Sequence, residues 1–269
     1  MLAALSPARR RLLLGLLTVL VAAAVAVVAG IVVPRLTSSA PPPVSQEQAG
    51  PVLLVPGYGG STESLQTLAQ RLTAAGRDAV VVPVPGDGTG DLHDSADALA
   101  TAVDDALART GAGSVDVVGY SAGGVIARLW AADGGASQAR RILTLGSPHH
   151  GTTLADLGAG IAPDQCPVGC QQLTTDSPLL AHLNAGDETP DGPTWVSLWS
   201  TADQTVTPPD SAHLDGAVDL PVQSVCADSR VAHGQLPSDP VVQGLVLAEL
   251  ATGPPAQLGP ADCARLRRG

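Results

Sequence analysis

The chain has 269 residues, a length that suits one domain of about 220 residues preceded by an N-terminal appendage. Acidic residues (25) outnumber basic residues (14, all of them Arg), and the resulting net charge of -11 argues against nucleic-acid binding, which needs a basic surface. Because the chain has no Phe although 45% of its residues are hydrophobic, its core must consist of Val, Leu and Ala, as in a parallel sheet covered by helices.

The appendage begins with a basic cluster at residues 9–11, followed by the uncharged residues 12–33 and by Pro34. The uncharged run is just long enough to span a bilayer, and the basic cluster orients the N-terminus inward and the rest of the chain outward. We expect residues 1–33 to be either a cleaved signal peptide or a retained membrane anchor, and the sequence favours neither alternative. Residues 34–50, rich in Pro and Ser, predict an extended linker. The body of the chain is therefore expected outside the cell, secreted or anchored to the outer face of the membrane.

Four cysteines follow in the body: Cys166, Cys170, Cys226 and Cys263. An even number of cysteines in an exported chain predicts disulfides, and three pairings are possible. We favour Cys166 with Cys170, and Cys226 with Cys263, which would tie the C-terminal tail to the domain. The spacing does not match a zinc site, so no metal is expected.

From residue 51 onward the sequence alternates strand and helix patterns. Strands are expected at residues 52–55, 79–84, 114–118, 141–145, 195–199 and 218–225, and helices at 61–75, around 98–107, from 121 onward and at 238–250. Repeated strand–helix units predict an α/β domain over residues 51–269, with a mostly parallel central sheet and helices on both faces. Residues 151–193 are irregular and are a candidate cap or acyl-binding wall.

The central strand ends in the pattern G-x-S-x-G, formed by Gly119, Ser121 and Gly123. The pattern is weak by itself, because an ordinary Gly-rich turn with a bystander serine would also contain it. Here a buried strand ends at the first Gly, and an amphipathic helix starts at the Ser. That context predicts a nucleophile elbow, in which a sharp turn lifts the serine hydroxyl above the sheet.

A serine nucleophile needs a base, and the base needs an orienting acid. Because these groups follow the nucleophile in the order acid, then His, we expect Asp203 as the acid and His233 as the base. Asp203 follows the expected strand at residues 195–199, and His233 lies on the loop before the last helix. Weaker rivals to these two residues are His213, Asp210, Asp215 and Asp228.

Acyl transfer also needs two backbone N–H donors for the oxyanion of the tetrahedral intermediate. One donor should be Ala122, the residue after the nucleophile, and we assign the other to Tyr58 in the Gly-rich loop after the first strand. His149 and His150 follow the strand at residues 141–145 and are expected near the mouth of the site. The sequence favours neither substrate contact nor supporting packing as the role of these two histidines.

Five segments, in the expected order, resemble the secreted bacterial lipases of the α/β-hydrolase fold, including the small lipase A of bacilli. They are VPGYGG (55–60), GYSAGG (119–124), GSPHHGT (146–152), WSTADQTV (199–206) and LDGA (214–217). The resemblance covers residues 51–250 and implies hydrolysis of acylglycerols or other carboxylic esters, with Ser121, Asp203 and His233 as triad. Two features depart from the family pattern: Pro56 replaces the usual His before the oxyanion Gly, and residues 151–193 are longer than in the minimal lipases. Some larger relatives bind calcium near the His, and no matching ligand set is evident here.

The favoured function is therefore an exported lipase or carboxylesterase that acts through an acyl-serine intermediate. A cell-envelope acyltransferase or thioesterase remains an alternative, because only the acceptor and leaving group would change. A catalytically silent, membrane-tethered binding protein is the least favoured alternative. We expect a monomer without a cofactor, with a lipid or small ester as its partner, and membrane contact only through an uncleaved N-terminal segment.

Overall fold

The computed structural model describes residues 20, 21, 23 and 44–268. The chain divides into two units, 1–42 and 43–269, and the second carries the fold. The expected signal peptide or anchor, apart from residues 20, 21 and 23, and most of the expected linker lie outside the described residues. Within the described residues, no helix has both the length and the apolarity that crossing a membrane requires. Residues 44–50, assigned to the linker from the sequence, contact the folded unit, since the Gln46 side chain donates a hydrogen bond to the Arg140 carbonyl (3.1 Å).

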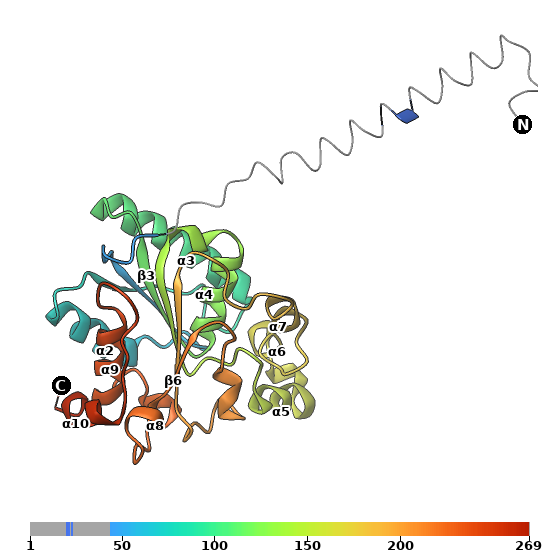
Figure 1. The fold of residues 1–269 in the computed structure, drawn as a ribbon. Helices are drawn as coiled ribbons and strands as arrows, with labels where there is room; N and C mark the ends of the chain where they lie inside the picture. Colours follow the sequence, from blue (N-terminus) through green and yellow to red (C-terminus); the bar gives the residue numbers. More distant parts are fainter. Residues whose placement is uncertain (1–19, 22, 24–43, 269) are drawn as a thin grey trace, which may run out of the picture. The chain divides into compact units, whose positions relative to one another are not determined.

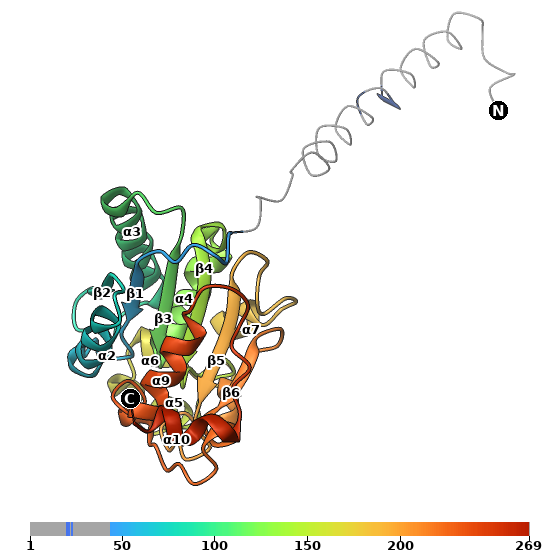
Figure 2. The ribbon, with the colours of Figure 1, turned by 60° about the vertical axis from the view of Figure 1, so that its left-hand side comes forward.

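A six-stranded sheet, parallel throughout, forms the centre of the domain, and its strand order is β2-β1-β3-β4-β5-β6 (Figure 2). The strands are β1 (Val52–Val55), β2 (Ala79–Val81), β3 (Val115–Tyr120), β4 (Ala139–Leu145), β5 (Thr194–Trp199) and β6 (Val218–Pro221). Alternate residues of a strand face opposite sides of a sheet, so Leu53 and Val55 join one core cluster while Val52 and Leu54 join the other. Both faces are therefore buried, which accounts for the continuous apolar runs of the sequence.

Helices cover both faces of the sheet (Figure 1). Helices α3 (Leu92–Thr110) and α4 (Ala122–Ala132) supply one core cluster, and α2 (Glu63–Ala74) and α9 (Pro240–Glu249) supply the other. The expected amphipathic pattern of α4 is wrong, because residues 122–131 are all buried. A helix that is enclosed on every side needs no polar face, and even Arg128 has its guanidinium bonded to the Leu183 and Glu188 carbonyls.

Residues 151–193 form a set of short helices beside the sheet. They are α5 (Thr153–Ile161), a 3-10 turn η3 (Pro163–Gln165), α6 (Val168–Gln171) and α7 (Pro178–Leu183). A disulfide joins Cys166 to Cys170 across the start of α6. The segment therefore has its own local structure.

The last strand is shorter than the sequence suggests. We expected a strand at residues 218–225, whereas β6 ends at Pro221 and residues 222–225 form the short helix α8. Pro221 cannot donate a ladder hydrogen bond, and its φ of -65° is suited to the start of a helix. The second expected disulfide, Cys226–Cys263, ties α10 (Cys263–Leu266) to the end of α8.

A buried ion pair lies in the β3 and β4 strands, near the ends at which they begin. The Arg140 guanidinium donates from Nε (2.9 Å) and Nη2 (2.6 Å) to the two oxygens of Asp116, and both side chains are fully buried. Arg77, from the loop before β2, donates to the same carboxylate. Because neither charge has access to water, removal of one side chain would leave the other as an uncompensated buried charge and destabilise the fold.

Candidate active site

Ser121 lies on a strained turn between β3 and α4. Its φ of 55° and ψ of -126° make it the one non-glycine residue with positive φ among those that the structure describes. The flanking glycines are required by close approach: a Cβ on Gly119 would lie 2.4 Å from the Gly123 carbonyl oxygen, and a Cβ on Gly123 would lie 2.2 Å from the Val55 carbonyl oxygen. A serine held in this conformation at the end of a central strand is the arrangement that the nucleophile elbow describes.

The structure brings Ser121, His233 and Asp203 into one hydrogen-bonded row. His233 Nε2 lies 3.0 Å from Ser121 Oγ, and His233 Nδ1 lies 2.7 Å from Asp203 Oδ2. An ionised carboxylate can only accept, so Nδ1 carries the imidazole proton and Nε2 is left to accept the proton of the Ser121 hydroxyl. The row can thus remove a proton from the serine oxygen while the Asp203 charge stabilises the imidazolium that results.

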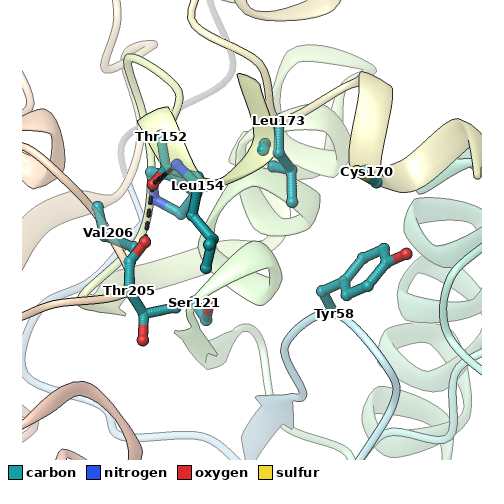
Figure 3. Close-up of a pocket in the computed structure, with 10 residues that line it drawn as sticks. Tyr58, Ser121, Thr152, Leu154, Cys170, Leu173, Thr205 and Val206 are labelled. Atoms are coloured by element: carbon teal, nitrogen blue, oxygen red, sulfur yellow. Dashed lines mark hydrogen bonds between the residues drawn. The ribbon is translucent and has the colours of Figure 1, made fainter. Parts of the chain in front are cut away.

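Backbone hydrogen bonds fix the orientation of the Asp203 carboxylate. Its Oδ1 accepts from the N–H groups of Thr205 (2.8 Å) and Val206 (2.9 Å), which leaves Oδ2 for the imidazole. The Thr152 hydroxyl, at the start of α5, donates to the Thr205 carbonyl (2.7 Å; dashed line in Figure 3). The loop that carries the acid is therefore tied to the segment at residues 151–193.

The rival residues named from the sequence do not join this row. His213 pairs with Asp219 at the surface (3.4 Å), and Asp228 pairs with Arg267. Among the described residues, neither Asp210 nor Asp215 forms a hydrogen bond or ion pair with His233, and Asp203 is the one carboxylate bonded to that imidazole.

Two residues beside the imidazole were assigned no role from the sequence. The Tyr120 hydroxyl donates to the His233 carbonyl (3.2 Å), and the two rings lie 5.2 Å apart with a tilt of 32°. Burial and the nearby Asp203 carboxylate raise the pKa of Tyr120 to about 12, so its hydroxyl stays protonated and able to donate. Its place inside the motif, next to Ser121, is the signal that could have identified it.

Gly146, at the end of β4, is the second. It has a φ of 54°, and a Cβ there would lie 3.2 Å from Asp203 Oδ2 and 3.4 Å from His233 Nδ1. The same Cβ would lie 2.5 Å from Leu236 Cδ1, at the end of a side chain that can move aside, so the positive φ is the main reason for glycine at this position.

The residues assigned to the oxyanion hole lie beside the nucleophile. Ala122 is the first residue of α4, and neither its N–H nor that of Tyr58 donates a hydrogen bond to another part of the described chain. The loop that carries Tyr58 approaches closely, because a Cβ on Gly57 would lie 2.9 Å from Ser121 Cβ. Hydrogen bonds from Gly59 to the Gly88 carbonyl (3.0 Å) and from Gly60 to the Gly57 carbonyl (3.0 Å) hold this loop.

An apolar cavity of about 160 Å³ opens beside Ser121 (Figure 3). Its wall includes Leu154 and Ala155 of α5, together with Leu173, which follows α6. Tyr58 and Val206 close it from the oxyanion loop and from the loop that carries Asp203. Residues of the segment 151–193 thus contribute directly to the wall of the cavity.

His149 and His150 do not line this cavity. His149 is fully buried, with Nε2 3.1 Å from the Thr144 hydroxyl, and its burial, Arg128 and His150 together hold its pKa well below the usual value. His150 Nε2 lies 3.0 Å from Glu188 Oε1. Of the two roles that the sequence left open, these contacts favour supporting packing.

Comparison with known proteins agrees with this architecture. Residues 50–164 match the family model described as the alpha/beta hydrolase fold. Lipase B of Aspergillus fumigatus is similar in structure (TM-score 0.65, 20% identity, 81% of this chain and 55% of that chain). So is the lipase BlEst2 of Bacillus licheniformis in its mature form (TM-score 0.55, 20% identity, 67% of this chain and 86% of that chain).

The propeptide form of the same Bacillus lipase gives a TM-score of 0.65 at 21% identity, over 80% of this chain and 53% of that chain. The chain thus spans about half the length of the fungal lipase and of the propeptide form. No curated protein matches the chain significantly.

Proposed function

Starting from the α/β-hydrolase fold of this chain, we propose that it is a serine hydrolase that cleaves carboxylic esters of lipids through an acyl-Ser121 intermediate. The observation that carries the proposal is the hydrogen-bonded row from Ser121 Oγ through His233 to Asp203, at distances of 3.0 and 2.7 Å. Geometry of this kind identifies a nucleophile with its base and its orienting acid on any fold.

Ser121 Oγ attacks the ester carbonyl carbon while its proton moves to His233 Nε2. The carbonyl oxygen becomes an oxyanion, and the free N–H groups of Ala122 and Tyr58 are the donors that would stabilise it. The intermediate collapses when the C–O bond to the alcohol breaks, and His233 gives its proton to the departing alcohol oxygen. An acyl ester on Ser121 remains.

Water completes the reaction in a second, equivalent half. His233 Nε2 takes a proton from the water as its oxygen attacks the acyl carbon, and the oxyanion forms again at the same place. When the bond to Ser121 Oγ breaks, the proton on His233 returns to the serine oxygen and the carboxylic acid leaves. The Asp203 carboxylate stabilises the imidazolium in both halves without itself taking the proton.

A lipid acyl chain is the substrate class that the surroundings of Ser121 support. The cavity beside the nucleophile is apolar, and its wall residue Leu154 is 52% exposed. Leu157 (55% exposed) and Ile161 (75%) follow on the same side of α5, and Val168 (48%) begins the adjacent α6. Exposed apolar patches mark surfaces that bind membranes, ligands or other proteins, and the apolar cavity next to this patch favours lipid.

Export is part of the proposal. The disulfides Cys166–Cys170 and Cys226–Cys263 are the kind of bond that persists in an oxidising compartment. The uncharged run at residues 12–33 fits either a cleaved signal or a retained anchor, and both would deliver the domain to the outside.

The test compares the full-length protein with its Ser121→Ala variant on chromogenic esters of increasing chain length, from acetyl to palmitoyl. We expect hydrolysis by the parent protein, loss of at least three orders of magnitude in the variant, and a preference for chains longer than acetyl. The matched control is Ser137→Ala, because Ser137 is exposed and its hydroxyl bonds only the Gly134 carbonyl. If the parent protein and Ser121→Ala are equally inactive on every ester, hydrolysis is wrong, and acyl transfer or binding becomes the better reading.

A further inference from the structure

A second hollow, distinct from the apolar cavity, lies on the other side of the oxyanion loop. It is a groove of about 520 Å³, and we call it the hydroxyl groove. Its walls come from the oxyanion loop, from one side of α2, from Tyr120 and from the segment just after His233. The hydroxyl-bearing side chains on these walls, apart from the two Tyr, are Ser61, Ser64, Thr67 and Ser238.

Part of the wall of the hydroxyl groove lies next to the reacting groups. Tyr120 and Gly234 line it, and they are the chain neighbours of Ser121 and His233. Gly57 lines it as well, and a Cβ on Gly57 would lie 3.5 Å from Ser121 Oγ. Tyr58 lines both the groove and the apolar cavity. The two hollows therefore share the wall formed by Tyr58, and both lie next to the reacting groups.

This arrangement separates the two halves of an ester. If the acyl chain occupies the apolar cavity, the alcohol oxygen must lie near His233 Nε2, which returns a proton to it. The remainder of the alcohol then extends away from the cavity, and the hydroxyl groove is the hollow that adjoins this point.

The chemistry of the groove differs from that of the cavity. Among the hydrogen bonds of residues 44–268, none involves the side chains of Ser61, Ser64 or Thr67, so these hydroxyls are available to a ligand. The charged side chain on the groove wall is Glu63, and the described residues contribute no Arg or His to it. Hydroxyls beside a carboxylate can bond the hydroxyls of a ligand, whereas a phosphate group would be repelled by Glu63 and would find no cation.

We propose that the hydroxyl groove binds the alcohol half of the substrate, and that this alcohol is an uncharged polyol. The rings of Tyr58 and Tyr120 would contact the carbon skeleton of the polyol while the α2 hydroxyls bond its oxygens. This inference rests on the proposed ester hydrolysis and deepens it, because it assigns specificity to groups outside the acyl cavity.

The experiment measures kcat/KM of the full-length protein on octanoyl esters of methanol, of glycerol and of glycerol 3-phosphate, so that only the alcohol differs. We expect the glycerol ester to exceed the methyl ester by about tenfold, since each net hydrogen bond corresponds to roughly two- to tenfold. The glycerol 3-phosphate ester should fall below the glycerol ester, and Glu63→Gln should narrow that difference.

The double variant Ser64→Ala, Thr67→Val tests the groove itself. We expect it to lower the ratio of glycerol ester to methyl ester about three- to tenfold, because two hydroxyl partners are lost. Thr101→Val is the matched control: this exposed threonine of α3 lines a different groove, and its hydroxyl bonds the Asp97 carbonyl. Thermal unfolding midpoints show whether each variant remains folded.

The two proposals fail in different ways. Hydrolysis of all three esters at similar kcat/KM, or an unchanged ratio in the double variant, overturns the assignment of the groove and leaves ester hydrolysis standing. Preference for the glycerol 3-phosphate ester overturns the choice of an uncharged alcohol. Inactivity on every ester overturns the proposed function, and the assignment of the groove with it.

Discussion

The hydrogen bonds of Asp203 make the outcome of an Asp203→Asn substitution predictable in direction and size. Asp203 Oδ1 accepts two backbone N–H groups, from Thr205 at 2.8 Å and from Val206 at 2.9 Å. An amide in this place must keep its carbonyl oxygen there, since its NH₂ group cannot accept. The NH₂ group then points at His233 Nδ1, where the carboxylate oxygen now lies 2.7 Å away.

This orientation forces the wrong tautomer on the imidazole. With an amide N–H donating to it, Nδ1 of His233 must be unprotonated, so the proton lies on Nε2 and points at Ser121 Oγ. The base can no longer accept the serine proton. In serine proteases the same substitution lowers kcat by about 10⁴-fold, which corresponds to about 5.4 kcal/mol of transition-state stabilisation.

The assay is kcat/KM on a short chromogenic ester at neutral pH, with the thermal unfolding midpoint as the check on folding. The matched control is Asp219→Asn, because Asp219 also pairs with a histidine, His213, but at the surface (3.4 Å). We expect the control to keep the activity of the parent protein. An Asp203→Asn variant that folds normally and keeps more than a tenth of that activity would refute the reasoning from the two backbone N–H groups.

Three further predictions follow from single contacts. Tyr120→Phe removes the 3.2 Å hydrogen bond to the His233 carbonyl, and steady-state kinetics should show kcat lowered about three- to tenfold, the worth of one hydrogen bond; an unchanged kcat would leave the hydroxyl without a positioning role. Asp116→Ala leaves the fully buried Arg140 without its carboxylate, so urea denaturation should give a free energy of unfolding lower by about 3–5 kcal/mol; a loss below 1 kcal/mol would contradict a paired buried charge. His149 has its pKa held well below the usual value of 6.5, so it contributes stability above pH 6.5 that is lost as the pH falls through 6.5 toward the pKa of the folded state. His149→Gln should therefore flatten the decline in unfolding free energy between pH 7 and pH 5, and an equally steep decline in both proteins would argue against a neutral, buried imidazole.

Much of the fold could be predicted because the sheet is buried on both faces. Strands of this kind are continuous apolar runs bounded by Gly and Pro, and all six expected strands start within two residues of an observed strand and coincide with most of it. The expected strand at residues 218–225 nevertheless runs four residues past the end of β6, because Val occurs on both sides of Pro221 and composition does not separate the two parts. The end of β6 is set by the missing N–H of Pro221 and by the packing of α8, and the periodicity of the sequence predicts neither.

The row at Ser121 could be anticipated because each member follows a strand, and strand ends of a parallel sheet converge at one edge. The supporting residues could not. The role of Tyr120 depends on where the His233 backbone returns, and that of Gly146 on an acid–base pair contributed by two distant loops. Likewise, His149 and His150 are adjacent in sequence but have different surroundings. His149 is buried and contacts the Thr144 hydroxyl, whereas His150 pairs with Glu188.

The central claim is that Ser121 becomes acylated, and covalent trapping tests it most directly. The full-length protein would be treated with a 4-nitrophenyl alkylphosphonate, whose phosphorus is attacked by an activated serine to leave a stable adduct, and then digested for peptide mass spectrometry. The account predicts one phosphonate on the peptide that contains Ser121, none in Ser121→Ala, and slower labelling in His233→Ala, because His233 Nε2 lies 3.0 Å from the attacking oxygen. Labelling of another residue, or equal labelling of the parent protein and Ser121→Ala, would contradict it.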